Sequence, residues 1–376
     1  GKTFIQSLPR IYGIYTGGFL LFFFAMALLE KFGLSARAIG LCFVGFTIFI
    51  YAFIGILSRT AAADAYYLAG RSVPPVFNGM ATAADWMSGA SFVAMAGGIF
   101  MSGYPYLAFV VGWTGGYILV ATLMAPYLRK FGCYTVPDFI GTRYGGKLSR
   151  FCAIIVLIVA SFTYVTAQIT ATGTIAARAF LIPFEVGCWL GLAGILVCSM
   201  LGGMRAVTWT QVAQYIVLIV AYILPIVWMS GAQGFGWFPQ FQYGPAVAHI
   251  QELEPVLGVG TPPTDTVAGL SALTTLHAAP AEGAMAAWQF VTLAFCMMVG
   301  TASLPHILMR YFTTPSVKAA RSSVAWSLFF IFLLYFSAPA LATLSKLSLF
   351  DPQLASSIFG KAIADVLCVH DERIND

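Results

Sequence analysis

The chain consists largely of long apolar stretches that few charges interrupt, such as AIGLCFVGFTIFIYAFIGIL at residues 38–57. A helix needs ~20 such residues to cross the hydrocarbon core of a bilayer. Only 9% of the 376 residues are charged and 60% are hydrophobic, whereas a soluble domain carries about 25% charged residues. Because lipid offers no hydrogen bonds, these stretches must satisfy their backbone groups within helices. The sequence therefore predicts an all-α, polytopic membrane protein.

We predict about nine transmembrane helices, at residues 11–30, 38–57, 77–101, 104–127, 149–178, 184–202, 208–229, 286–310 and 322–345. The first follows Lys2 and Arg10 and would also suit a signal peptide, but its length and bulky side chains favour a retained helix. With a cytoplasmic amino terminus, 13 of the 19 Lys and Arg residues, Arg310 among them, fall on the inside and 6 on the outside. Positive charge favours cytoplasmic loops, so we expect the amino terminus in the cytoplasm.

The third of these stretches contains an acid, Asp85, in FNGMATAADWMSGASFVAMAGGIF. A carboxylate at bilayer depth costs roughly 2.5–3.5 kcal/mol even on insertion-based scales, so a function is expected for it. Asp85 would also suit the cap of a half-helix that starts at Trp86. The glycines of the stretch, among them Gly97 and Gly98, either loosen the helix or allow close helix packing.

A second interrupted helix is predicted in the eighth stretch, where residues 300–303 (GTAS) precede Pro305 and His306. Proline removes a backbone donor and clashes with the preceding turn, which releases carbonyl groups. Released carbonyls are tolerated at that depth only where they line a cavity or are buried in protein. The two interrupted helices lie five spans apart and therefore cross in opposite directions. This arrangement is typical of the inverted repeats of secondary transporters, whose broken helices hold ions and substrate.

The remaining intramembrane polar residues leave alternatives open. Tyr164 and Gln168 lie one turn apart on one helix face and suit either a polar cavity or a bond between helices. His306 suits either a substrate site or a hydrogen-bonded buried position. The segment 230–285 has no Lys or Arg, which predicts an outside loop that acts as a lid or as a loosely ordered connector.

Several function classes are excluded. No metalloprotease, hydrolase or phosphate-loop motif occurs, and the four histidines form no metal-ligand spacing. The seven cysteines include no C-x-x-C pair, which argues against a zinc site or a disulfide framework. No compact run of Lys and Arg suggests nucleic acid. We therefore expect no enzyme, no catalytic residue, no cofactor and no required protein partner.

Four segments carry a resemblance to a known family: DAYYLAGRSVPP (64–75), YTVPDFIGTRYGG (134–146), GGMRAVTWTQVAQ (202–214) and GTASLPHILMRYFTTPS (300–316). In this order they resemble the sodium:solute symporter family, and most of all its bacterial cation/acetate symporters, which are monocarboxylate permeases. The resemblance implies a multi-pass protein of the bacterial cytoplasmic (inner) membrane. It also implies a leucine-transporter-like fold of two inverted five-helix repeats.

The resemblance implies the following organisation of a single transporter domain over residues 1–376. Two accessory amino-terminal helices occupy 1–62, the first five-helix repeat 63–229, the extracellular or periplasmic loop 230–285, and the start of the second repeat 286–345. An atypical, polar tail follows at 346–376. The family's later helices, which carry hydroxyl ligands for sodium, have no counterpart here, so we expect that the fold is incomplete and that the chain is truncated at its carboxyl terminus.

The resemblance also implies the site. Alignment of the family's acid at the first helix break with Asp85 places sodium-binding carbonyls at Ala83 and Trp86, with Asp85 supporting the cation electrostatically or ordering the break. The substrate would lie beside them, near Ser88, Ser91, Tyr164, Gln168, Ser303 and His306. No metal other than sodium is expected.

The function implied is a sodium-coupled secondary symporter that imports a small, acetate-like monocarboxylate across the cytoplasmic membrane. The alternatives are the membrane sensor domain of a signalling protein built on the symporter fold, or a non-functional fragment. The partners expected are Na⁺, the monocarboxylate and the lipid bilayer.

Overall fold

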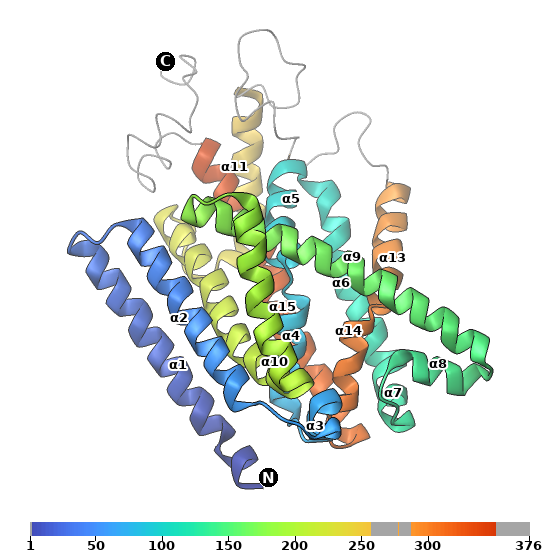
Figure 1. The fold of residues 1–376 in the computed structure, drawn as a ribbon. Helices are drawn as coiled ribbons and strands as arrows, with labels where there is room; N and C mark the ends of the chain where they lie inside the picture. The colour runs from blue at the N-terminus through green and yellow to red at the C-terminus, as the bar shows by residue number, and fades with distance from the viewer. Residues whose placement is uncertain (1, 257–276, 278–286, 351–376) are drawn as a thin grey trace. The chain divides into compact units, whose positions relative to one another are not determined.

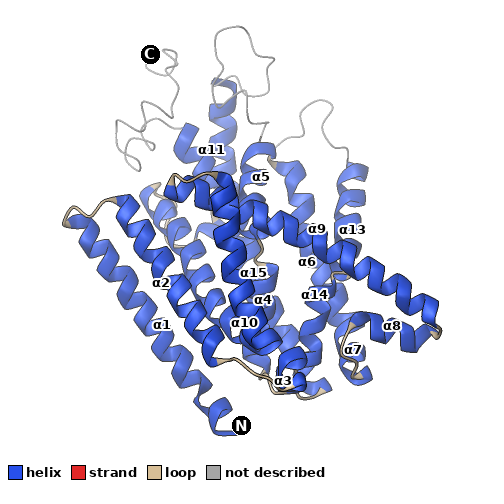
Figure 2. Cartoon of the chain, viewed as in Figure 1, coloured by secondary structure: helices blue, strands red, loops and turns tan. Residues whose placement is uncertain are grey.

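A computed structural model describes residues 2–256, 277 and 287–350 of the chain. Within these ranges every regular element is helical and none is a strand (Figure 2), which confirms the all-α prediction. The α-helices are α1 (Lys2–Lys31), α2 (Ala36–Leu57), α3 (Ala63–Leu68), α4 (Pro75–Trp86), α5 (Met95–Ser102), α6 (Leu107–Leu119), α7 (Ala125–Phe131), α8 (Val136–Tyr144), α9 (Lys147–Phe180), α10 (Phe184–Ala232), α11 (Tyr243–Val256), α13 (Ala287–Ala302), α14 (Pro305–Leu308) and α15 (Val317–Phe350). The predicted tail beyond residue 350 lies outside the described residues.

Six stretches of helix are long and apolar enough to cross a membrane: Gln6–Lys31, Ala38–Leu57, Tyr104–Phe131, Lys147–Arg178, Gly202–Ala232 and Val317–Phe350. A seventh results if Ala287–Ala302 and Pro305–Thr313 are joined across their break. These seven match seven of the nine predicted spans. The other two predicted spans, 77–101 and 184–202, are helical but do not meet the length criterion.

The reason in each case is a local backbone feature. The stretch 77–101 is divided after Trp86, where Met87 has ψ 57° and the α-helix stops; a π-helix, η2 (Ala90–Ala94), and α5 follow. The stretch 184–202 ends at Gly203, whose φ of 52° and ψ of −141° are not helical. Glycine adopts this backbone conformation at little cost because it has no Cβ.

The described residues form two compact units. Those of the first lie within Gly1–Gly89, Val120–Leu218 and Ser303–Phe330, and those of the second lie within Ala90–Leu119, Ile219–Ala302 and Ile331–Asp376. Two of the boundaries, at 89/90 and 302/303, fall within two residues of the helix breaks. The broken helices are therefore where the chain passes from one unit to the other.

The core of the first unit joins α1 to α4 and to the part of α10 that follows Gly203. Tyr12 packs against the rings of Phe77 and Trp209, at 5.4 and 6.4 Å between ring centroids, and its hydroxyl donates a 2.8 Å hydrogen bond to the Trp209 carbonyl. In the same unit α1 and α2 run side by side (Figure 1). The predicted retained first helix is thus packed against the core.

Gly79 explains how closely α4 approaches α15 in this unit. A Cβ atom built at Gly79 would lie 2.6 Å from the Cβ of Trp326, which no real contact tolerates. Asn78, next to it, is fully buried and bonds to three groups: its amide nitrogen donates to the Arg310 carbonyl and the Ser323 hydroxyl, and its oxygen accepts from Thr313. The amino-terminal part of the interrupted helix is therefore firmly fixed.

In the second unit α6 packs closely on α13. Cβ atoms built at Gly112 and Gly116 would lie 2.7 Å from the carbonyl oxygens of Ala294 and Met298 respectively. Small residues four apart allow such close approach of membrane helices. The segment predicted as an outside loop contains the ordered helix α11, whose Ile250 packs with Leu347 and Phe350 of α15.

Candidate ion and substrate site

Asp85 lies in the last turn of α4 and is paired with Arg310. The Nε of Arg310 donates to one carboxylate oxygen, and its Nη2 donates to the other at 3.1 Å. The side chain of Arg310 is 2% exposed and that of Asp85 is 10% exposed. A two-point guanidinium–carboxylate contact is the strongest geometry that such a pair can take. The acid that the sequence places at membrane depth is thus neutralised by an arginine 225 residues further on.

Further groups from α10 complete this cluster. The Gln211 side-chain amide donates to the Asp85 carboxylate, and Arg310 Nη1 donates to the Thr208 hydroxyl at 2.8 Å and approaches the Met204 sulfur at 3.6 Å. Arg310 itself lies in a 3₁₀ turn, η6 (Met309–Thr313), directly after α14. The cluster therefore ties the end of α4 to the segment after the second break and to α10, all within the first unit.

A second group of predicted residues gathers in the same unit. The ring of Tyr164 lies over the imidazole of His306, with centroids 4.3 Å apart. The Tyr164 hydroxyl interacts with the side chain of Ser88, and Asp85 acts electrostatically on both Tyr164 and His306. Gln168, one turn after Tyr164 on α9, accepts a 3.0 Å hydrogen bond from the backbone N–H of Gly89.

The structure confirms that Tyr164 and Gln168 share one face of α9. Most of α9 is exposed, and both residues belong to its half-buried stripe, which also includes Ala153, Leu157, Ala160 and Ala171. The spacing of three and four residues along this stripe marks one helix face. That face positions the tyrosine and the glutamine at the first helix break.

The predicted sodium carbonyls lie at the carboxyl end of α4. The Ala83 carbonyl accepts a 2.8 Å hydrogen bond from the backbone N–H of Met87, and Ala83 and Trp86 are both buried. The last carbonyls of a helix carry its negative dipole end. The last turn of α4 therefore presents a partial negative charge where the α-helix ends, after Trp86.

The other two predicted residues lie just after the first break and at the second. Ser91 belongs to η2 in the second unit, where its hydroxyl lies 3.2 Å from that of Tyr335. Ser303 lies at the second break itself and is exposed.

Arg310 is the main residue that sequence reasoning did not assign to the site. It was counted with the charges of an inside loop, yet it is buried and paired within the protein. The signal was present, because a buried acid calls for a cation, and the motif GTASLPHILMRYFTTPS contains one. Gln211 and Thr208 lie in the quoted motif GGMRAVTWTQVAQ, but neither residue type indicates by itself that it faces a charge.

In the described part of the chain, which is helical throughout, a buried polar cluster lies beside two helix breaks, an arrangement typical of secondary transporters. The family model of the sodium:solute symporter family matches residues 66–361. The chain is 42% identical to an uncharacterized symporter of Cupriavidus necator, over 93% of this chain and 64% of that protein's length. The chain thus spans somewhat less than two thirds of this relative.

Among solved structures, the chain is similar to a Na⁺-coupled sialic acid symporter in a substrate-bound outward-open state. The match has a TM-score of 0.54 and 15% sequence identity, and it covers 88% of this chain and 70% of the other. At this identity the likeness concerns the fold, and it confirms the leucine-transporter-like fold. The chain belongs to the sodium:solute symporter family.

Proposed function

We propose that this protein acts in sodium-coupled symport and imports a small, acetate-like monocarboxylate across the bacterial cytoplasmic membrane. The observation that carries the proposal is the polar cluster at the first helix break, where Asp85, Ser88, Tyr164 and His306 interact. Membership of a family of sodium:solute symporters supports the sodium coupling. The choice of a monocarboxylate rests on the charge balance of the cluster.

Asp85 and Arg310 balance each other's charge in the cluster. Arg310 is neutralised by Asp85, so the cluster offers no unpaired charge to a substrate. The groups around the break that remain are hydrogen-bonding groups: the hydroxyls of Ser88 and Tyr164, the amide of Gln168 and the imidazole of His306. A monocarboxylate and one Na⁺ together add no net charge to this low-dielectric region, where an unpaired ion would be costly.

In the proposed mechanism Na⁺ binds first at the carbonyls of Ala83 and Trp86, at the negative end of the α4 dipole. The bound cation then attracts the carboxylate, which accepts hydrogen bonds from Tyr164, Gln168 and Ser88. Each ligand tightens the other, typically by 1–3 kcal/mol in coupled systems. The breaks at Met87–Ser88 and Ser303–Leu304 supply the hinges at which the helices can move.

The test is uptake of labelled acetate by proteoliposomes that contain the full protein of which this chain is part, with and without an inward Na⁺ gradient. We expect gradient-driven uptake that Asp85→Asn makes far less dependent on sodium than Asp64→Asn does. Asp64 is an exposed acid of α3 in the same unit and serves as the control. Equal sodium dependence in the two variants would remove Asp85 from the mechanism. If uptake by the unsubstituted protein does not depend on the Na⁺ gradient, the proposed sodium coupling is wrong.

A further inference from the structure

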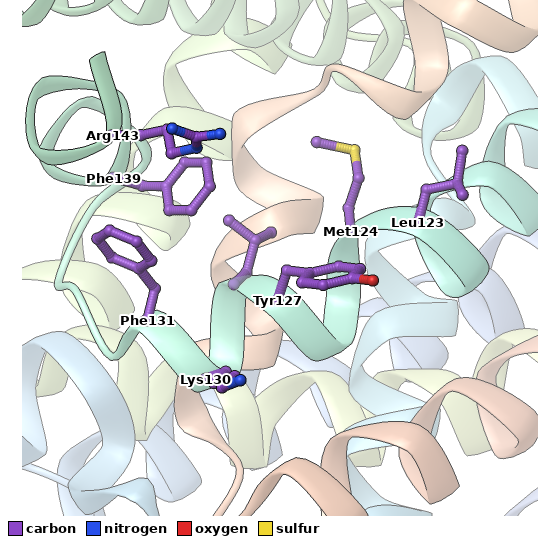
Figure 3. Close-up of a pocket in the computed structure, with 8 residues that line it drawn as sticks. Leu123, Met124, Tyr127, Lys130, Phe131, Phe139 and Arg143 are labelled. Atoms are coloured by element: carbon purple, nitrogen blue, oxygen red, sulfur yellow. The ribbon is translucent and has the colours of Figure 1, made fainter.

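One groove of the first unit lies between α7 and α8. It encloses about 730 Å³, a volume within the range of small-molecule sites. Its floor is apolar, and Leu123, Tyr127, Phe131 and Phe139 contribute to it. Figure 3 shows Phe131 and Phe139 facing each other at one end of the groove and Leu123 at the other. The two phenyl rings meet edge to face, with 4.8 Å between their centroids.

These apolar side chains are open to the surroundings of the protein. Leu123 is 62% exposed, Tyr127 64% and Phe131 43%. All three belong to the last turns of the candidate span Tyr104–Phe131, so the groove continues the lipid-facing side of a membrane helix. Tyrosine is enriched at this level, where the bilayer interior meets water. The floor of the groove is therefore placed to contact acyl chains.

The rim of the groove is cationic. Lys130 and Arg143 border it, and residues 129–150 contain five Lys and Arg residues but only one acid, Asp138. That acid is already engaged, because it accepts from Arg150 and from the Thr135 hydroxyl at 2.8 Å. Within the described part of the chain, Lys130 and Arg143 form no ion pair. The groove thus combines an apolar floor with two positive charges that its own loop does not neutralise.

We propose that this groove binds an anionic phospholipid, with an acyl chain on the Phe131–Phe139 floor and the anionic headgroup at the rim, where Lys130 and Arg143 supply the positive charge. Basic pockets at the ends of membrane helices suit anionic headgroups. A zwitterionic lipid would satisfy the floor but would gain little from the two charges. The site lies in the loop with the largest excess of positive charge, which the topology places in the cytoplasm, so the lipid belongs to the inner leaflet.

The test uses the purified protein in detergent and native mass spectrometry with phosphatidylglycerol and phosphatidylcholine of the same acyl chains. A cation near an anionic lipid contributes about 1 kcal/mol, which is about fivefold in affinity. We therefore expect phosphatidylglycerol to be retained selectively, and Lys130→Gln with Arg143→Gln to weaken it roughly 25-fold. The matched control, Lys147→Gln with Arg178→Gln, removes the same two charge types from exposed positions of α9 and leaves retention unchanged.

Three outcomes would overturn the proposal. Equal retention of both lipids would remove the anionic selectivity. Displacement of the lipid by glycerol 3-phosphate at comparable concentration would mean that the rim is a phosphate site without a lipid. Failure of the unsubstituted protein to retain either lipid would mean that something else covers the groove. Because these three measurements need no variant, the test does not depend on whether the double variant folds.

Discussion

Among the described residues, each of the two units contains one buried ion pair, and the two pairs are built differently. In the first unit Asp85 and Arg310 make a two-point contact, with Gln211 on the carboxylate and Thr208 on the guanidinium. In the second unit Glu254 of α11 meets Lys346 of α15 at 3.2 Å, with side chains that are 3% and 0% exposed. The backbone N–H of His277 also donates to Glu254 at 2.8 Å, and Lys346 lies 5.2 Å from the ring centroid of Phe350.

The difference shows what each pair is suited to do. A planar guanidinium fixes its partner's orientation through several hydrogen bonds, whereas an ammonium acts as a compact point charge. The arginine pair therefore determines the geometry of the break after α4, at the candidate site. The lysine pair connects α11, a helix of the predicted outside loop, to the end of α15. Removing one partner of either pair leaves a buried charge, which is far more damaging than removing both.

The largest effect is expected from Arg310→Met. This change leaves the Asp85 carboxylate buried with Gln211 as its remaining donor, and it should lower the free energy of unfolding by about 3–5 kcal/mol. The measurement is thermal or denaturant unfolding of the purified protein in detergent. The double variant Arg310→Met with Asp85→Asn should recover most of the loss. If it does not, the lost packing of the arginine and not the unpaired charge is responsible.

Breaking the second ion pair should lower the free energy of unfolding by less than breaking the first. In Lys346→Met the Glu254 carboxylate keeps the backbone N–H of His277 as a donor, so we expect a loss of about 2–4 kcal/mol. The same unfolding measurement applies, and Glu254→Gln added to Lys346→Met should restore stability. A loss larger than that of Arg310→Met would reverse the ranking of the two pairs.

The length and apolar composition of the stretches were sufficient to predict most of the membrane-spanning helices. Seven of nine predicted spans are single or once-broken apolar helices, because a membrane crossing needs about twenty apolar residues whatever their order. The end of 184–202 was also placed correctly, at Gly203, where the backbone leaves the helical region. Tyr164 and Gln168 were predicted to share a face, and they do. These are local properties, which a sequence encodes directly.

Which distant residues pair with each other could not be predicted from the sequence in the same way. The sequence marks Asp85 as costly, but 19 Lys and Arg residues compete as its partner, and the one that pairs with it is 225 positions away. The resemblance placed Ser91 beside Ser88 at the substrate site. The π-helix at Ala90–Ala94 alters the helical repeat after Ser88, since its turn contains an additional residue, and the Ser91 hydroxyl lies 3.2 Å from that of Tyr335 in the second unit.

The planar geometry of the first pair can be tested without removing its charge. In Arg310→Lys the side chain can no longer bond both carboxylate oxygens and Thr208 in one plane, so we expect a loss of about 2 kcal/mol, one charged hydrogen bond. Arg150→Lys is the matched control, because Arg150 pairs with Asp138 at a side chain that is 59% exposed. Exposed pairs contribute about 0–1 kcal/mol. An equal loss in both variants, measured by unfolding in detergent, would contradict a geometric role for Arg310.

The smallest effect concerns pH and the histidine beside the second pair. His277 is fully buried, and burial first, with Lys346 adding to it, lowers its pKa from 6.5 to about 4. Glu254 and Tyr243 are the other titratable groups that the structure describes beside it. In the folded protein the imidazole stays neutral, whereas the unfolded chain takes up a proton below its pKa of about 6.5. The contribution of His277 to stability is therefore complete above pH 6.5 and is lost as the pH falls towards 4.

Between about pH 7.5 and about pH 5.5 this difference lowers the free energy of unfolding by about 1 kcal/mol. Unfolding measured at the two pH values should show a drop that His277→Gln abolishes. His249→Gln, on α11, should leave the drop intact because His249 takes no part in the lysine pair. If both variants keep the full drop, the pH dependence comes from other groups.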